Sequence, residues 1–358
     1  MLDSATELDM HKLEAFGGRM VGLLNDGFLA LLVSVGYRTN LFETLAELPP
    51  ATSEEIAEAA GLQERYVREW LGGMVVGGII EHDADADTYR LPPEHAAMVT
   101  RAAGPDDLAF FTQYVALCGQ VEDRVVDSFR KGGGVPYEAY PNFQELQAAE
   151  TAREFDAKLV DTWLPLVPGV GEQLQSGIRV LDVGCGRGHA VNLLAAAYPA
   201  SSFAGYDFSR DGIEGARAEA SALGLANVRF DVKDVSELAE PEGYELITAF
   251  DVVHDLARPE QTLAAIHDAL VPGGRFFMVD IQASSHLHEN VEHPLGPLLY
   301  SVSVFHCMTV SLAQDGPGLG TVWGEQTATR LLREAGFSKV EVEHVEGDVF
   351  HVFYVATK

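Results

Sequence analysis

The residues of this chain whose types and spacing could support chemistry begin directly behind a strand-like run, RVLDVG. Gly184, Gly186 and Gly188 form a G-x-G-x-G loop that leads into a helical segment. Glycine has no side chain, so a ligand can approach the backbone of such a loop closely. A dinucleotide fingerprint would need its third glycine at position 189, where the chain has His189. The loop therefore does not predict an NAD site.

Two carboxylates lie near the ends of neighbouring strand-like runs. Asp182 precedes the end of the first run, and Asp207 ends the next one. At the carboxyl edge of adjacent parallel strands, Asp207 can accept hydrogen bonds from both hydroxyls of a ribose. The glycine loop leaves room for an amino-acid tail beside it. This pair of features predicts a ligand that joins a nucleoside to an amino acid.

The elements that must position these residues follow from the apolar pattern after Ile178. Strand-like runs, among them SFAGYD, NVRFDV, YELITAF and GGRFFMV, alternate with amphipathic helical segments. This alternation predicts an α/β fold, in which a mostly parallel sheet carries helices on both faces. Two final runs, KVEVEHV and DVFHVFYVAT, flank a tight turn and predict a hairpin at one sheet edge.

Residues 178–358 resemble the class I methyltransferases that use S-adenosylmethionine. VLDVGCGRG resembles the first motif of that family, GYDFS the acidic second motif, DVKDV the third, and LVPGGRFFMVD the strand that follows the fourth. The resemblance implies a doubly wound, seven-stranded Rossmann-like sheet. It also implies S-adenosyl-L-methionine as the cofactor and a small molecule as the methyl acceptor.

The same resemblance assigns roles around the cofactor. Asp182 and the three glycines would form the loop on the methionine side, and Asp207 would bind the ribose. Phe208 would line the adenine pocket, Asp234 would accept a hydrogen bond from the adenine amine, and Phe250 would line the methionine side.

A His-Asp pair follows the run YELITAF. Plant and bacterial O-methyltransferases with an N-terminal winged-helix domain deprotonate the acceptor hydroxyl with such a pair, so the resemblance makes His254 the candidate base and Asp255 its partner. A neutral hydroxyl is a poor nucleophile until its proton leaves, and an imidazole with a pKa of about 6.5 can take that proton. Those enzymes usually read HDW, whereas Leu256 stands third here.

A long insertion from Ile281 to Glu325 is expected to cover the substrate, because ordinary connections have about 4 to 6 residues. We expect His306, Cys307 and Met308 to line the acceptor pocket, and Tyr137 to close over the cofactor. The insertion is rich in histidine, but the spacing matches no closed zinc pattern. We therefore predict no metal site.

Three regions are predicted: a winged-helix-like dimerisation domain over 1–100, a helical linker and lid over 101–175, and the methyltransferase domain over 176–358. A winged helix can bind DNA. Between 51 and 100, however, three basic residues face ten acidic ones, a net charge of −7, and the whole chain carries −30. Such charge repels phosphate, so we expect no nucleic-acid partner.

An apolar helix is predicted over 19–35, interrupted by Asn25 and Asp26, and we expect it to be too short to span a bilayer. It could instead form the core of a homodimer. The first residues lack the basic start of a signal peptide, and three scattered cysteines suggest a reducing cytoplasm.

The sequence thus predicts a cytoplasmic, homodimeric methyltransferase that acts on a small-molecule hydroxyl. Two alternatives remain open: an enzyme of the same fold that methylates nitrogen, sulfur or carbon, and a non-enzymatic winged-helix regulator that senses S-adenosylmethionine.

Overall fold

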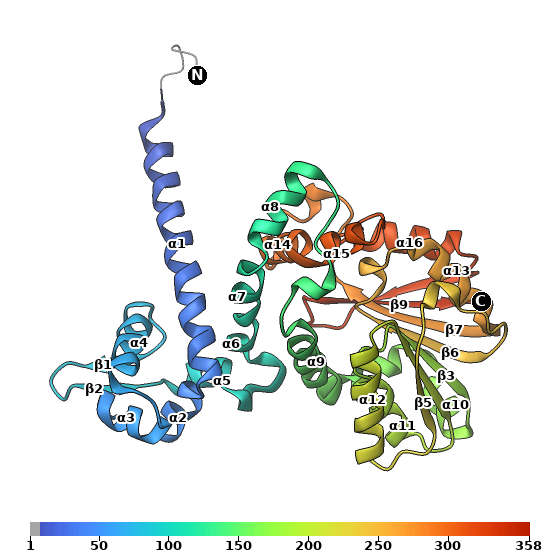
Figure 1. The fold of residues 1–358 in the computed structure, drawn as a ribbon, viewed down its shortest axis with the longest axis horizontal. Coiled ribbons are helices and arrows are strands. Elements are labelled where there is room, and N and C mark those ends of the chain that lie inside the picture. The colour runs from blue at the N-terminus through green and yellow to red at the C-terminus, as the bar shows by residue number, and fades with distance from the viewer. Residues whose placement is uncertain (1–7) are drawn as a thin grey trace. The chain divides into compact units, whose positions relative to one another are not determined.

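The computed structural model describes residues 8–358. The chain forms two compact units, one ending at Gly119 and the other beginning at Gln120 (Figure 1). The first unit is built of helices and one two-stranded antiparallel sheet. Its elements are α1 Met10–Arg38, α2 Leu41–Glu47, α3 Ser53–Ala60, α4 Glu64–Val76, β1 Glu81–Asp83, β2 Thr88–Arg90, α5 Pro93–Val99, η1 Arg101–Asp106, α6 Leu108–Phe111 and α7 Gln113–Gly119.

Helix, turn, helix and hairpin follow one another in this unit as a winged helix requires. Thr52 caps α3: its hydroxyl accepts a hydrogen bond from the Glu55 N–H, and its own N–H donates to the Glu55 carboxylate at 2.8 Å, which forms a capping box. Gly61 then ends α3 in the left-handed conformation. Trp70 and Phe42 pack edge to face in the core of the unit.

Helix α1 is longer than the predicted segment 19–35. It extends over 29 residues and leaves large apolar side chains exposed, among them Phe16, Leu24 and Phe28. Met10–Arg38 and Gly296–Ala313 are both long and apolar enough to cross a membrane by length and composition alone. The expectation that the first stretch is too short to do so is therefore wrong on length. Core helices of folded proteins have the same properties.

The second unit contains a seven-stranded sheet in the order β5-β4-β3-β6-β7-β9-β8 (Figure 1). The first five strands in this order are parallel, whereas β9 pairs antiparallel with both β7 and β8. This arrangement confirms the predicted α/β fold and its edge hairpin. The strands are β3 Arg179–Val183, β4 Ser202–Asp207, β5 Val228–Val232, β6 Tyr244–Phe250, β7 Leu270–Ile281, β8 Lys339–Glu343 and β9 His351–Thr357.

Helices cover both faces of the sheet because its strands are apolar on both sides. Phe276 of β7 belongs to one buried cluster with Leu263 of α13 and Leu331 of α16. Its neighbour Phe277 belongs to the other, with helices α10, α11 and α12. These helices are α10 Val170–Ser176, α11 His189–Ala197, α12 Arg210–Ala222, α13 Pro259–Ala269 and α16 Gly324–Glu334.

Two further groups of helices accompany the sheet. The segment before it contains α8 Glu122–Lys131, η2 Tyr137–Ala139, α9 Phe143–Glu154, the π-helical η3 Phe155–Trp163 and η4 Leu164–Leu166. The connections after the strands contain η5 Val235–Glu237, η6 Val253–Asp255, η7 Leu287–Glu289, α14 Gly296–Val302, the π-helical η8 Ser303–Cys307 and α15 Met308–Ala313. The long insertion is therefore largely helical.

Candidate active site

The glycine loop connects β3 to α11 and is folded onto the end of β4. The backbone N–H groups of Gly184 and Cys185 both donate to the Tyr206 carbonyl, at 2.8 and 3.1 Å. Gly184 and Gly188 have positive φ, and a Cβ on either would lie 2.5 Å from a neighbouring side chain. Only glycine fits these two positions without displacing the packing around the loop.

Asp207 at the end of β4 is held by the same loop. Its Oδ2 accepts a hydrogen bond from the Gly186 N–H at 2.9 Å, and its Oδ1 accepts one from the Ser209 N–H at 2.7 Å. Burial raises the pKa of Asp207, although these two hydrogen bonds act in the opposite direction. Each oxygen retains a lone pair, so the fixed carboxylate can still accept bonds from a ligand.

Asp182 lies deeper than Asp207. Its Oδ1 accepts a 2.6 Å hydrogen bond from the Thr248 hydroxyl of β6. Complete burial raises the pKa of this carboxyl to about 7. Asp182 thus links β3 to β6 next to the glycine loop.

A cavity of about 540 Å³ opens beside the loop. All eight residues predicted to bind the cofactor line it, together with Tyr137 and Asp255 from the predicted pocket and base. The cofactor residues concerned are Asp182, Gly184, Gly186, Gly188, Asp207, Phe208, Asp234 and Phe250. The structure therefore brings the sequence-predicted cofactor residues to one place.

Asp234 is half-exposed and bound to Arg258 at 2.5 Å. Its Oδ1 also accepts a hydrogen bond from the Ser236 N–H at 2.9 Å. Partial burial acts to raise the pKa of Asp234, but the bonds from Ser236 and the charge of Arg258 outweigh it and lower the pKa. Arg258 belongs to the residues that follow the His-Asp pair and differ from the HDW pattern. The difference therefore also affects Asp234, a predicted cofactor residue.

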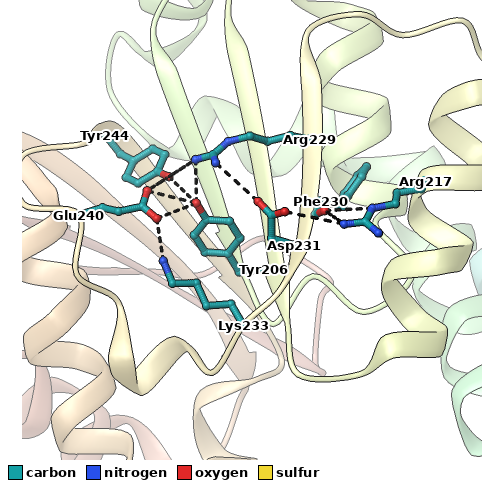
Figure 2. Close-up of polar contacts among 8 residues, drawn as sticks. All are labelled: Tyr206, Arg217, Arg229, Phe230, Asp231, Lys233, Glu240 and Tyr244. Atoms are coloured by element: carbon teal, nitrogen blue, oxygen red, sulfur yellow. Dashed lines mark hydrogen bonds and ion pairs between the residues drawn. The ribbon is translucent and has the colours of Figure 1, made fainter.

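A cluster of polar side chains surrounds Glu240 (Figure 2). Glu240 accepts hydrogen bonds from the hydroxyls of Tyr206 and Tyr244, at 2.9 and 2.5 Å, and from Lys233 at 2.7 Å. Arg229 donates to both tyrosine oxygens. Partial burial acts to raise the pKa of Glu240, but these donors lower it to about 2. The cluster fixes Lys233, which lines the cavity. Sequence reasoning did not identify it.

His254 lies in η6, where Asp251 turns the chain out of β6 with a positive φ. His254 is only 3% exposed and, like residues 306–308, is not among the residues of the described chain that line the cavity. Its Nδ1 lies 2.7 Å from Oδ1 of Asp280, and its Nε2 lies 3.4 Å from Oδ1 of Asp255. Burial acts to lower the pKa of His254, but Asp280 and Asp255 together raise it well above its usual value.

Asp280, rather than the predicted Asp255, is the hydrogen-bonding partner that orients this imidazole. It is fully buried at the end of β7, where its Oδ1 also accepts bonds from the Trp323 indole at 3.0 Å and from the Ile281 N–H at 2.8 Å. Sequence reasoning missed Asp280, although it ends the run LVPGGRFFMVD. A polar residue at the carboxyl end of a buried strand was the available signal.

Asp255 faces the cavity in front of His254. Its Oδ2 accepts a 2.9 Å hydrogen bond from the hydroxyl of Tyr137, which comes from the segment before the sheet. The Tyr137 ring lies beside that of Phe208, with centroids 5.6 Å apart. Gln144 of α9 donates to the Ser209 hydroxyl at 3.0 Å. This segment thus contacts both Asp255, the residue next to the candidate base, and the loop after Asp207.

The positions of His306, Cys307 and Met308 differ from those of the predicted cofactor residues. Within residues 8–358, none of the three is among those that line the cavity. His306 and Cys307 are buried behind Asp255, and the His306 ring stacks on Phe143 with centroids 3.8 Å apart. Burial lowers the pKa of His306 to about 4. The insertion is helical at this point, and the side chains of His306 and Cys307 face the interior.

Two family models match the chain. The model described as an Rv2258c-like winged HTH domain matches residues 27–101, and the one described as a methyltransferase domain matches residues 174–336. The ubiquinone biosynthesis O-methyltransferase of Neisseria meningitidis serogroup C is 30% identical over 117 residues, 31% of this chain and 48% of that protein. The chain therefore spans less than half the length of this curated relative.

Solved structures resemble the chain over nearly its whole length. Mitomycin 7-O-methyltransferase has a TM-score of 0.69 at 18% identity, covering 98% of this chain and 100% of that one. Human N-acetylserotonin methyltransferase, solved with S-adenosylmethionine, has a TM-score of 0.64 at 18% identity, covering 100% and 99%. At this level of identity the similarity establishes the shared fold.

Proposed function

Because the chain combines a winged helix-turn-helix domain with a class I methyltransferase domain, we propose that it transfers a methyl group from S-adenosylmethionine to a hydroxyl of a small molecule. The proposal depends chiefly on one observation, the His254–Asp280 pair beside a cavity lined by all the predicted cofactor residues.

The cavity suits S-adenosylmethionine because its donors and acceptors differ along its length. Asp207 would hold the ribose, with Phe208 and Asp234 at the adenine and the glycine loop at the methionine tail. The bound cofactor supplies a sulfonium-activated methyl group. The protein must position an acceptor in line with that group and remove the acceptor's proton.

His254 can remove this proton. The short contact with the Asp280 carboxylate places hydrogen on Nδ1, which donates it; in the neutral imidazole this leaves the lone pair on Nε2. An acceptor hydroxyl beside Asp255 would lose its proton to Nε2. Asp280 and Asp255 then stabilise the imidazolium that forms, which agrees with the direction in which they shift the pKa of His254.

A screen of phenols, catechols, thiols and amines with a radiolabelled methyl donor tests this function. We expect transfer to an oxygen acceptor, and His254→Ala should lower turnover about 10²- to 10⁴-fold with cofactor affinity nearly intact. Transfer only to nitrogen, sulfur or carbon would indicate the alternative enzyme class. Cofactor binding without transfer to any acceptor would favour a regulator.

We also propose that α1 pairs two copies of the chain. Its exposed Phe16, Leu24 and Phe28 form an apolar surface that is unusual on a monomer. Arg19 and Asp26 interrupt the same helix, which makes a membrane a poor environment for it. Sedimentation at micromolar concentration should give a dimer, and Phe16→Glu with Phe28→Glu should give a monomer. A monomeric unmodified chain would contradict the pairing.

Acidic charge and free thiols complete the proposal. The net charge of −7 between 51 and 100 disfavours a nucleic-acid partner for the winged helix, and gel-shift binding to duplex DNA at physiological salt should be absent.

Cys118, Cys185 and Cys307 are all unpaired. Free thiols agree with the cytoplasmic location that we propose.

A further inference from the structure

Three side chains with metal-binding atoms converge behind the cavity wall. His254, Asp255 and Cys307 each offer one ligand atom, and the three atoms lie within 4.8 Å of one another. His254 and Cys307 are buried, and Asp255 is partly buried. We propose that this trio binds a divalent cation of the zinc class, a site that differs from the histidine-rich pattern considered in the sequence.

The hydrogen bonds around His254 have the form that metal-binding histidines require. A ligating imidazole usually donates its second ring N–H to a carboxylate, which fixes the tautomer and leaves the other nitrogen for the metal. Asp280 accepts at Nδ1 and is itself held by Trp323. Once Nε2 has given up its proton, its lone pair faces Asp255 and Cys307, so a bound metal would replace that proton.

The carboxylate of Asp255 has one oxygen available to bind a cation. Its Oδ2 is occupied by the hydroxyl of Tyr137. Its Oδ1 is buried, lies 3.4 Å from Nε2 of His254, and accepts no hydrogen bond from any residue between 8 and 358. A buried carboxylate oxygen without a donor is costly, and a cation at this point would remove that cost.

The donor set selects the kind of cation. A thiolate, an imidazole and a carboxylate favour zinc over magnesium or calcium, which prefer oxygen ligands only. Binding would form a metal–sulfur bond and release the proton of the Cys307 thiol to the buffer. Asp255 lines the cavity and thus connects the proposed site to it.

One consequence rests on the proposed function. A metal bound to Nε2 of His254 occupies the lone pair that would accept the acceptor's proton. Zinc should therefore inhibit methyl transfer, and a chelator should restore it.

Binding can be measured on the full chain without cofactor or acceptor. Calorimetry with zinc should give one equivalent, and cobalt should produce a thiolate charge-transfer absorption in the near ultraviolet. Cys307→Ser should abolish this absorption and weaken zinc at least about 10-fold, the smallest loss expected even for an outer partner. Cys118→Ser, in α7 of the other unit, and His288→Ala, in the exposed histidine-rich stretch, should change neither.

Absence of the absorption, or zinc affinity that survives Cys307→Ser, would overturn the proposed site. If circular dichroism shows that Cys307→Ser is unfolded, Asp255→Asn replaces it: this variant should weaken zinc at least about 10-fold although the thiolate absorption remains, and unchanged zinc affinity would overturn the proposed site. The activity assay separates the two proposals. Zinc binding without inhibition would keep the metal site and refute His254 as the base, whereas an active enzyme that binds no zinc would refute the metal site alone.

Discussion

The cofactor side of the cavity and the buried corner around His254, behind Asp255, draw their residues from very different distances along the chain. The cofactor side uses positions 182 to 188, 207 and 234, on consecutive strands of one βαβ series. The corner around His254 joins Tyr137, Asp280, Cys307 and Trp323, which belong to four separate segments. A ligand that binds backbone atoms needs a local motif, whereas a buried proton acceptor needs partners that only the finished fold brings together.

The sharpest test of this comparison is Asp280→Asn. The amide has the same shape as the carboxylate but can donate to Nδ1, which would favour the wrong tautomer of His254. We expect turnover to fall about 10²- to 10⁴-fold while cofactor affinity stays nearly unchanged. The double variant with His254→Ala should be no slower than His254→Ala alone. If Asp280→Asn turned over as fast as the unmodified chain, His254 would not depend on Asp280. The proposed difference between the cofactor side and the corner around His254 would then be wrong.

The converse result is expected on the cofactor side. Asp207→Ala should weaken S-adenosylmethionine by about 2 to 3 kcal/mol, the range for hydrogen bonds to a charged group. Calorimetry measures this directly. Asp231→Ala removes a half-exposed carboxylate from the neighbouring strand β5 and provides the control. Equal affinities for the two variants would show that Asp207 does not contact the ribose.

The cluster of Figure 2 predicts a pH-dependent stability on the cofactor side. Glu240→Gln should lower the unfolding free energy by about 1 to 3 kcal/mol at neutral pH, because it removes a charge that accepts several hydrogen bonds. The folded pKa of Glu240 is depressed to about 2, so its contribution is present above the unfolded pKa of about 4.5 and is lost as pH falls toward 2.

Denaturant titrations at pH 7 and pH 3.5 measure the difference in unfolding free energy between Glu240→Gln and the unmodified chain. This difference should be smaller at pH 3.5. Glu237→Gln, an exposed glutamate in η5, should behave like the unmodified chain at both values. A larger difference in unfolding free energy at pH 3.5 would contradict the lowered pKa of Glu240.

The smallest effect is expected at His189, which begins α11 directly after the glycine loop. Its Nε2 lies 2.9 Å from Asp156, and its Nδ1 contacts Glu219. Burial acts to lower the pKa of His189, but these carboxylates raise it overall. Its stabilisation is therefore present below the unfolded pKa of about 6.5 and is lost as pH rises through the folded pKa.

His189→Asn should cost up to about 1 kcal/mol at pH 6, since Asp156 is largely exposed and solvent screens the pair. At pH 9 the variant and the unmodified chain should have similar unfolding free energies. A constant difference at both pH values would mean that packing, and not charge, holds this position.

Local patterns explain how far the sequence analysis could reach. The capping box at Thr52 and the glycine loop involve residues within a few positions of each other, so their chemistry was visible in the chain. Asp280 is 26 positions from His254, and no local pattern relates the two. The π-helical turn η8 also directs His306 and Cys307 into the interior, a change of face that helical periodicity does not reveal.

The position of β9 has a consequence for how the chain is made. β9 pairs along β7 from Ile281 to Arg275, but His351 follows Ile281 by 70 positions. At about 5 to 20 residues per second, ribosomes need several seconds to synthesise that interval. During this time β7, with Phe276, Phe277 and Met278, has an unpaired apolar edge. Nascent chains would be prone to aggregate then, and a chaperone that shields extended apolar segments should raise the yield of folded protein.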